Sequence, residues 1–245
     1  MLTASVIIAA GGTGRRFIGP AAPAGAPSGG RPPTKVFMPM AGRPVLAHTL
    51  DRFAAVDEVL EVIVAVPADW VDEARRTFGD SLGPSRRLEF VAGGTDRTES
   101  VERALAATDW GPGLVAIHDA VRPLIRPAVI SEALRAAAEH GGAVVGRPLD
   151  HTVKEVDGDR RVLATVPRQA LWVAQTPQVF RRDVIARAYA ERDRAAAVTD
   201  DAQLVEALGL EVVMVQGDAA NIKITTPEDL RMCEALLAAG WPFGR

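Results

Sequence analysis

The stretch Val6-Ile7-Ile8-Ala9-Ala10-Gly11-Gly12-Thr13-Gly14-Arg15-Arg16 decides the fold. A run of β-branched apolar residues is typical of a buried strand, and the glycines after it predict a tight turn from strand to helix. Glycine lets backbone N–H groups approach a phosphate closely, and arginine adds a forked donor that is always charged. The stretch therefore predicts an opening strand with an anion site at its carboxyl end.

The glycine turn departs from two common phosphate-binding loops. No Gly-Lys-Ser/Thr follows at the spacing of a P-loop, and Phe17 stands where the dinucleotide fingerprint needs its third glycine. An NAD-dependent oxidoreductase is therefore disfavoured. A tight turn that only exposes Arg15 and Arg16 to solvent stays open as the alternative to phosphate binding.

Similar apolar runs alternate with helical patterns along the rest of the chain. The expected strands are Ser5–Ala10, Val59–Val66, Leu88–Val91, Leu114–His118, Ala143–Gly146 and Val212–Val215. The expected helices are Val45–Ala54, Asp69–Phe78, Asp96–Ala107 and Ala128–His140. This alternation predicts one α/β domain over residues 1–245, with a mostly parallel sheet and helices on both faces. Ligands of such sheets bind at the carboxyl ends of the strands.

Three passages break this alternation. Gly19–Pro33 is rich in glycine and proline and predicts a mobile loop, either over a ligand or as a tolerated surface insertion. Thr152–Val166 holds two β-prone runs around an Asp-Gly turn, which predicts that residues 148–168 project as a β-hairpin arm able to pair with another subunit. Arg181–Gly209 predicts two helices with a break near Ala197–Thr199.

Charge and composition exclude several classes of protein. The net charge of −3 argues against a nucleic-acid binder or a basic membrane-surface protein. The first fifty residues nevertheless hold five basic residues and no acidic one, which indicates that an anion is handled there. The single cysteine, Cys233, lies in an apolar helical pattern and is expected in the core of a protein from a reducing compartment. No signal peptide or membrane span is expected, so the predicted location is the cytoplasm.

Two further strand-to-helix junctions carry polar residues. In His118-Asp119-Ala120-Val121-Arg122-Pro123, Asp119 and Arg122 are candidates for binding substrate or metal-bound water, unless they only pair with each other. His118 is interpreted as a packed structural residue. In Gly93-Gly94-Thr95-Asp96-Arg97-Thr98-Glu99-Ser100, the hydroxyl groups could contact a base or ribose, while Asp96 and Glu99 form the pattern of a capping box.

Lysine is scarce, with three residues against 25 arginines, so each lysine is a candidate for a specific role. Lys223 lies between two isoleucines just before a helix that begins with the cap Thr226 and Pro227. A functional role is favoured over simple pairing with a local acid such as Asp218.

The motifs together resemble one family of enzymes. They are AAGGTGRR (9–16), Lys35 followed by Phe37, GGTDRTES (93–100), HDAVRP (118–123), DHTVKEV (150–156), WVAQTPQVF (172–180), TDDAQLVEALG (199–209) and NIKIT (221–225). In this order and spacing they are similar to the 2-C-methyl-D-erythritol 4-phosphate cytidylyltransferases, over nearly the whole chain. The resemblance implies a Rossmann-like nucleotidyltransferase domain that transfers CMP from CTP to methylerythritol phosphate and releases pyrophosphate, in non-mevalonate isoprenoid precursor biosynthesis.

The resemblance also implies the residue roles, a Mg²⁺ cofactor held mainly by CTP phosphates, and a homodimer that binds neither nucleic acid nor membrane. The implied catalytic residues are Arg16 and Lys35 on the CTP phosphates, with Arg168 and Lys223 on the attacking phosphate. The implied substrate-binding residues are Ala9, Ala10, Gly11, Gly12, Gly94, Ser100, Asp119, Arg122, Thr152 and Thr199. Gly94 and Ser100 would meet the cytosine, and the arm of a partner subunit would contribute Thr152 and Arg168.

Two features depart from the family pattern. Gly19–Pro33 is longer than the usual link, and Val36 stands where glutamine is common. Two rival functions remain at the level of sequence. One is a cytidylyltransferase for another polyol phosphate such as ribitol 5-phosphate, which would share the nucleotide half of the site. The other is a non-catalytic nucleotide-binding module, which should have lost Arg16, Lys35 or Lys223; the chain retains all three.

Overall fold

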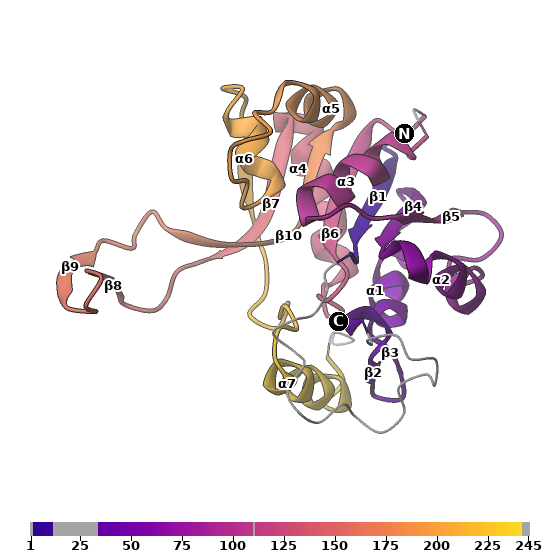
Figure 1. The fold of residues 1–245 in the computed structure, drawn as a ribbon, viewed down its shortest axis with the longest axis horizontal. Helices are drawn as coiled ribbons and strands as arrows, with labels where there is room; N and C mark the ends of the chain where they lie inside the picture. The colour runs from indigo at the N-terminus through magenta and orange to yellow at the C-terminus, as the bar shows by residue number, and fades with distance from the viewer. Residues whose placement is uncertain (1, 12–33, 110, 242–245) are drawn as a thin grey trace.

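A seven-stranded sheet forms the centre of the protein in the computed structural model, which describes residues 2–11, 34–109 and 111–241 (Figure 1). The strands lie in the order β11-β7-β10-β6-β1-β4-β5. Their bounds are β1 Ala4–Ala9, β4 Val59–Val66, β5 Arg87–Ala92, β6 Leu114–Asp119, β7 Gly142–Pro148, β10 Trp172–Arg181 and β11 Val213–Gln216. The six strands expected from apolar runs are all present.

The strand β10 was not among the strands expected from apolar runs. This strand runs antiparallel to both of its neighbours, β6 and β7, while the other neighbouring pairs in the sheet are parallel. Its segment Gln175-Thr176-Pro177-Gln178 interrupts the apolar pattern, although Gln175, Thr176 and Gln178 are all buried. The sheet is therefore mostly parallel, with one long antiparallel strand through its middle.

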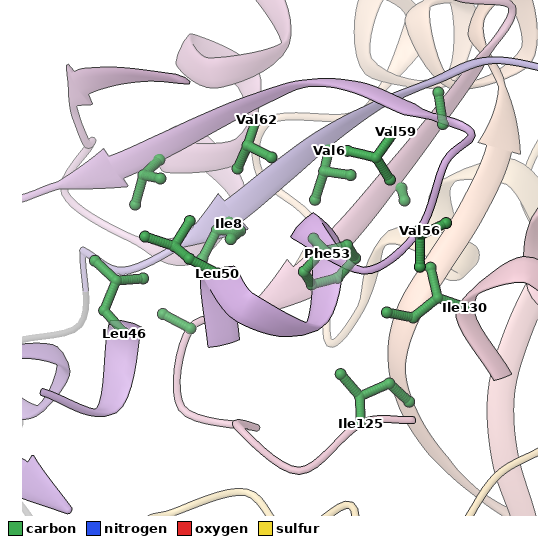
Figure 2. Packing of buried hydrophobic residues seen from close by; sticks show 14 of the residues in the cluster. Val6, Ile8, Leu46, Leu50, Phe53, Val56, Val59, Val62, Ile125 and Ile130 are labelled. Atoms are coloured by element: carbon green, nitrogen blue, oxygen red, sulfur yellow. The ribbon is translucent and has the colours of Figure 1, made fainter. Parts of the chain in front are cut away.

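Helices cover both faces of the sheet, as expected. Alternate residues of β1 point to opposite sides, so Val6 and Ile8 join one core cluster and Ile7 joins the other. The first cluster contains apolar side chains of α1 Val45–Ala54, α2 Val71–Phe78 and α4 Pro127–His140. Figure 2 shows part of it, with Leu50 and Phe53 of α1 against β1 and β4. The second contains side chains of α3 Arg97–Ala106, α5 Arg182–Glu191 and α6 Asp201–Glu206.

A third, smaller cluster lies beside α7 Pro227–Ala238 and includes Cys233, which is fully buried as expected. The α7 helix begins as predicted, with Thr226 as the N-cap and Pro227 in the first turn. The short strands β2 Pro39–Met40 and β3 Arg43–Pro44 pair with each other, and Met40 belongs to the same cluster. Two single turns, η1 Lys35–Phe37 and η2 Ala68–Trp70, complete the elements.

The predicted hairpin is present and projects from the body (Figure 1). It consists of β8 Val153–Val156 and β9 Val162–Val166, which pair antiparallel and lie between β7 and β10 in the chain. The predicted break between two helices after Arg181 is also present, because α5 ends at Glu191 and α6 begins at Asp201. The loop predicted over Gly19–Pro33 lies outside the described residues.

None of the helices in the described ranges is long and apolar enough to cross a membrane.

Candidate active site

The candidate site lies at the carboxyl ends of β1 and β6. These strands are parallel neighbours, and their register pairs Ala9 with Asp119. The backbone N–H of Ala120 donates to the carbonyl of Ala9 at 3.2 Å, so the ends of the two strands lie side by side. This is the edge at which parallel sheets bind ligands.

Asp119 is surrounded by three cations. Its Oδ1 accepts from Nε of Arg97 at 3.2 Å, and its Oδ2 lies 3.4 Å from Nε of Arg122 and 2.8 Å from Nζ of Lys223. The Asp119 side chain is only 7% exposed. Burial alone would raise the pKa of this carboxyl, but the charges of Arg97, Lys223 and Arg122 hold its pKa below the usual range. Asp119 is therefore a permanent negative charge inside a positive ring.

The expected candidates Asp119, Arg122 and Lys223 are thus brought together by the fold. The alternative partner for Lys223 was wrong, because Asp218 instead accepts from Arg126. The other alternative, that Asp119 and Arg122 pair with each other, is correct, but Asp119 also pairs with Arg97 and Lys223. Of the three cations around Asp119, Lys223 has the most exposed side chain, at 43%.

The segment that carries Lys223 is fixed by buried backbone and amide hydrogen bonds. Asn221 donates from Nδ2 to Oε1 of Gln175 and to the carbonyl of Thr176, both on β10. Arg122 donates from Nη1 to the carbonyl of Asn221 at 2.8 Å. The lysine therefore extends from an anchored backbone, and its position depends on the strand that sequence patterns missed.

Arg97 was not singled out by the sequence analysis. It lies at the start of α3, and its Nη2 forms a second ion pair, 2.8 Å from Oδ2 of Asp201 at the start of α6. The pKa of the Arg97 guanidinium is raised, because the charges of Asp201 and Asp119 outweigh the effect of its burial. The signal that could have found it is its place inside GGTDRTES, directly after a glycine turn.

Ser100, which holds Gly94, lies beside Gly11 at the end of β1. The Ser100 hydroxyl accepts from the Gly94 N–H at 2.9 Å and donates to the carbonyl of Asp96 at 2.7 Å. A Cβ at Gly11 would approach the same hydroxyl oxygen to 2.9 Å, so the close approach requires glycine there. Ser100 is 1% exposed, and its hydroxyl is already used to hold the glycine turn.

The expected capping box at α3 forms only in part. Asp96 accepts from the N–H of Glu99 at 2.8 Å, as an N-cap should. The Glu99 carboxylate instead accepts from the N–H and the hydroxyl of Thr95, one residue earlier than the box requires. Glu99 therefore ties the loop to the first turn of α3 through Thr95 and not through the N-cap residue Asp96.

Val36, the departure from the family pattern, has a structural explanation. It is 3% exposed and belongs to the core cluster that α1 and α2 cover, so an apolar residue fits there.

The remaining expected site residues differ in where the structure places them. Thr152 and Arg168 lie in the arm just outside β8 and β9 and are exposed, and Arg168 donates to the Asp150 carbonyl. Thr199 precedes α6 and bonds to Gln203. Gly12 and Arg16 lie outside the described residues, as does the side chain of Lys35. Ala10 is buried in the core cluster beside the site.

His118 is confirmed as a packed residue. It is fully buried, with Nδ1 3.0 Å from the Thr176 hydroxyl and Nε2 3.2 Å from the Arg122 carbonyl. Burial lowers the pKa of His118 to about 4, so the ring is neutral at neutral pH and serves as a hydrogen-bonding brace between β6, β10 and the Arg122 turn.

The residues fit a metal ion that arrives with its substrate better than a resident one. Among the described residues, no group of three or more His, Cys, Asp or Glu side chains is placed to hold a metal ion. Asp119 is the carboxylate at the site, and three cations already share its oxygens. Mg²⁺ commonly binds through substrate phosphates and one or two carboxylates, with water completing its shell.

Two solved structures share this fold over nearly the whole chain. One is 4-diphosphocytidyl-2C-methyl-D-erythritol synthase from Anaerococcus prevotii, which is 30% identical with a TM-score of 0.80. The match covers 97% of this chain and 99% of that chain. Another, 2-C-methyl-D-erythritol 4-phosphate cytidylyltransferase from Thermus thermophilus, is 33% identical with a TM-score of 0.74 over 97% of this chain and 100% of that chain. The class of this protein is therefore nucleotidyltransferase.

Sequence relatives narrow the class. A curated 2-C-methyl-D-erythritol 4-phosphate cytidylyltransferase from Symbiobacterium thermophilum is 41% identical over 234 residues, which cover 95% of this chain and 92% of the relative. The family model "IspD: 2-C-methyl-D-erythritol 4-phosphate cytidylyltransferase" matches residues 4–239. The chain belongs to this family, and it is a cytidylyltransferase of isoprenoid biosynthesis. Membership disfavours both the non-catalytic module and the ribitol phosphate alternative.

The low pKa of His118 makes stability depend on pH. The folded ring has a pKa of about 4, below its value of about 6.5 in an unfolded chain, so the unfolded state binds more protons at mildly acidic pH. The contribution of the neutral His118 ring to the free energy of unfolding is fully present above pH 6.5 and is lost as pH falls towards 4. Between pH 7 and pH 5, the free energy of unfolding should fall by roughly 2 kcal/mol through this group. Urea unfolding at both pH values, with wild type and His118→Gln, measures the difference.

The His151→Gln variant, which replaces an exposed histidine, is the control for the substitution itself. An equal loss of stability between pH 7 and pH 5 in wild type and His118→Gln would contradict the assignment of a buried neutral ring.

Proposed function

We propose the roles through which this chain carries out the family's reaction, the transfer of CMP from CTP to 2-C-methyl-D-erythritol 4-phosphate with release of pyrophosphate. CTP lies across the turn after β1, at Ala9, Ala10, Gly11 and Gly12, with its cytosine towards Gly94. Ser100 holds the glycine turn at Gly94 in place, because its hydroxyl accepts a hydrogen bond from the Gly94 N–H. The triphosphate extends towards Arg16 and Lys35.

One observation carries the proposal for the acceptor half. Asp119 lies in contact with Lys223, Arg122 and Arg97, and Lys223 is both the nearest of these and the most exposed. A lysine of this kind can turn from a carboxylate to an incoming phosphate, while the two arginines continue to neutralise Asp119. The site is thus charged in advance for the methylerythritol phosphate.

The chemical step needs positioning and charge neutralisation. An oxygen of the methylerythritol phosphate attacks the α-phosphorus of CTP in line, the bond from that phosphorus to the bridging oxygen breaks, and pyrophosphate leaves with the electron pair. Negative charge builds up on the oxygens around the α-phosphorus, and no covalent intermediate with the protein is required. Arg16 and Lys35 stabilise this charge, while Lys223 and Arg168 hold the attacking phosphate.

Mg²⁺ fits this site as a companion of the nucleotide. The CTP phosphates and water would supply most of the ligands of the ion, with Asp119 nearby. The bound ion would neutralise charge on the triphosphate.

The arm supports a homodimer in which each body receives Thr152 and Arg168 from the partner subunit. Within one chain the arm points away from the body (Figure 1), which supports a role for its polar residues in the site of a partner subunit. The arm also exposes apolar residues that a second copy could cover, namely Val156, Val162 and Leu163. A cytoplasmic location is proposed with this function, since Cys233 is a free buried thiol.

Replacing either proposed phosphate-binding lysine should remove most of the turnover. Lys35→Ala and Lys223→Ala each delete one cation that the transition state needs, so kcat should fall by about 10²–10³. Pyrophosphate release from CTP and methylerythritol phosphate measures the rate, and thermal unfolding shows that the fold survives. Lys154→Ala is the matched control, because its ammonium bonds to Thr165 on the arm. Near-normal rates in Lys35→Ala or Lys223→Ala would contradict the assigned roles.

Mixing two inactive variants tests the contribution of the partner's arm. Arg168→Ala and Lys223→Ala chains should each be nearly inactive alone. After random exchange of subunits, half of the dimers are mixed, and each has one site with both residues intact, so about a quarter of wild-type activity should return. If Arg168 served its own body instead, mixing would restore no activity.

A further inference from the structure

Arg97 joins two buried carboxylates that come from distant parts of the chain. Its Nε contacts Asp119 at the end of β6, and its Nη2 contacts Asp201 at the start of α6. The side chains of these acids are 7% and 1% exposed. A guanidinium can pair with both because its charge is spread over nitrogen atoms held in one rigid plane.

The Asp201 end of this bridge is rigidly held. Tyr189 donates its hydroxyl to Oδ1 of Asp201 at 2.7 Å, and the backbone N–H of Asp201 donates to Oε1 of Gln178 at 2.9 Å. Tyr189 and Gln178 are themselves buried. Arg97 is therefore tied on the side away from the site, and it has little freedom to follow a substrate.

The other fixed partner of Asp119 is Arg122, whose side chain is 12% exposed and which also donates to the Asn221 carbonyl. Lys223 differs from both arginines, because its side chain is 43% exposed and, among the described residues, its ammonium pairs with the single carboxylate of Asp119. When Lys223 turns to a phosphate, the two arginines remain to neutralise the buried carboxylate. Without Arg97, only Arg122 would remain, and Asp119 would hold Lys223 more tightly.

We propose that Arg97 is a positioning residue that shares the charge of Asp119 and thereby releases Lys223 to bind the phosphate of the acceptor. This inference rests on the proposed role of Lys223. Arg97 acts through Asp119 and does not itself contact the reacting atoms. Its effect should therefore fall on the acceptor and spare the nucleotide, because its charged contacts are with Asp119 and Asp201, while the proposed cytosine turn at Gly94 is held by Ser100.

The first measurement is steady-state kinetics of Arg97→Gln. The KM for methylerythritol phosphate should rise by about tenfold, the size expected for losing a charged hydrogen bond, while the KM for CTP stays unchanged. Arg97→Lys, which keeps the charge, should recover part of the loss. Because Arg97→Gln strands the buried Asp201, the double variant Arg97→Gln/Asp201→Asn is measured as well and should keep the raised KM with a restored fold.

The second measurement does not depend on turnover. Acetic anhydride labelling of the substrate-free protein, followed by peptide mass spectrometry, reports how firmly each lysine is held. Lys223 should react more slowly in Arg97→Gln than in wild type, with Lys154 of the same chain as the internal reference. Arg187→Gln, which removes an exposed arginine paired with Glu191, should change neither the kinetics nor the labelling.

The outcomes separate the inference from the function it rests on. Unchanged labelling of Lys223, together with an unchanged KM for methylerythritol phosphate in the folded double variant, would overturn the role of Arg97 alone. Normal turnover of Lys223→Ala would overturn the role of Lys223, whatever Arg97 does. A rise in both Michaelis constants, without slower labelling, would reduce Arg97 to a structural residue and would also contradict the inference.

Discussion

The buried carboxylate of Asp119 is the constraint around which the site is built. Removing such a charge from water costs several kcal/mol unless cations and hydrogen bonds compensate it. The compensation comes from α3 through Arg97, from the turn after β6 through Arg122 and from the segment before α7 through Lys223. These three parts of the chain are thereby tied to one point at the carboxyl edge of the sheet. The same arrangement leaves a positive ring where a phosphate can bind.

The antiparallel strand β10, which neighbours β6, holds Asp119 and its partners in place. Thr176 accepts from the N–H of Asp119 and contacts the buried ring of His118. Gln175 and the Thr176 carbonyl receive the amide of Asn221, which fixes the backbone next to Lys223. Gln178 accepts from the N–H of Asp201 and so fixes the far end of the Arg97 bridge. One strand therefore supports both the segment that carries Lys223 and Asp201, the second partner of Arg97.

This strand also shows where sequence patterns stop being informative. Apolar runs such as Val59–Val66 indicate buried strands because burial on both faces demands them, and the Asp-Gly turn indicates the arm from local geometry. In β10, buried glutamines and a threonine replace apolar residues, and a proline stands in the middle. Their burial is acceptable only because partners from distant segments satisfy them, and a local pattern does not contain those partners.

The site residues divide in the same way. Asp119 and Lys223 could be predicted, since one follows a buried strand and the other is a rare lysine between isoleucines. Arg97 could not, because its partners lie 22 and more than a hundred residues further along the chain, and its neighbours Asp96 and Glu99 match a local capping pattern. The roles proposed for Thr152 and Arg168 depend on a second copy, which a pattern within one chain does not contain.

The most direct test of the account is the release of pyrophosphate from CTP with different acceptors. Methylerythritol phosphate, ribitol 5-phosphate and no acceptor are compared at equal enzyme concentration. Family membership assigns methylerythritol phosphate as the acceptor, so it should support rapid release and the other two conditions almost none. Equal release with ribitol 5-phosphate, or release without any acceptor, would contradict that assignment.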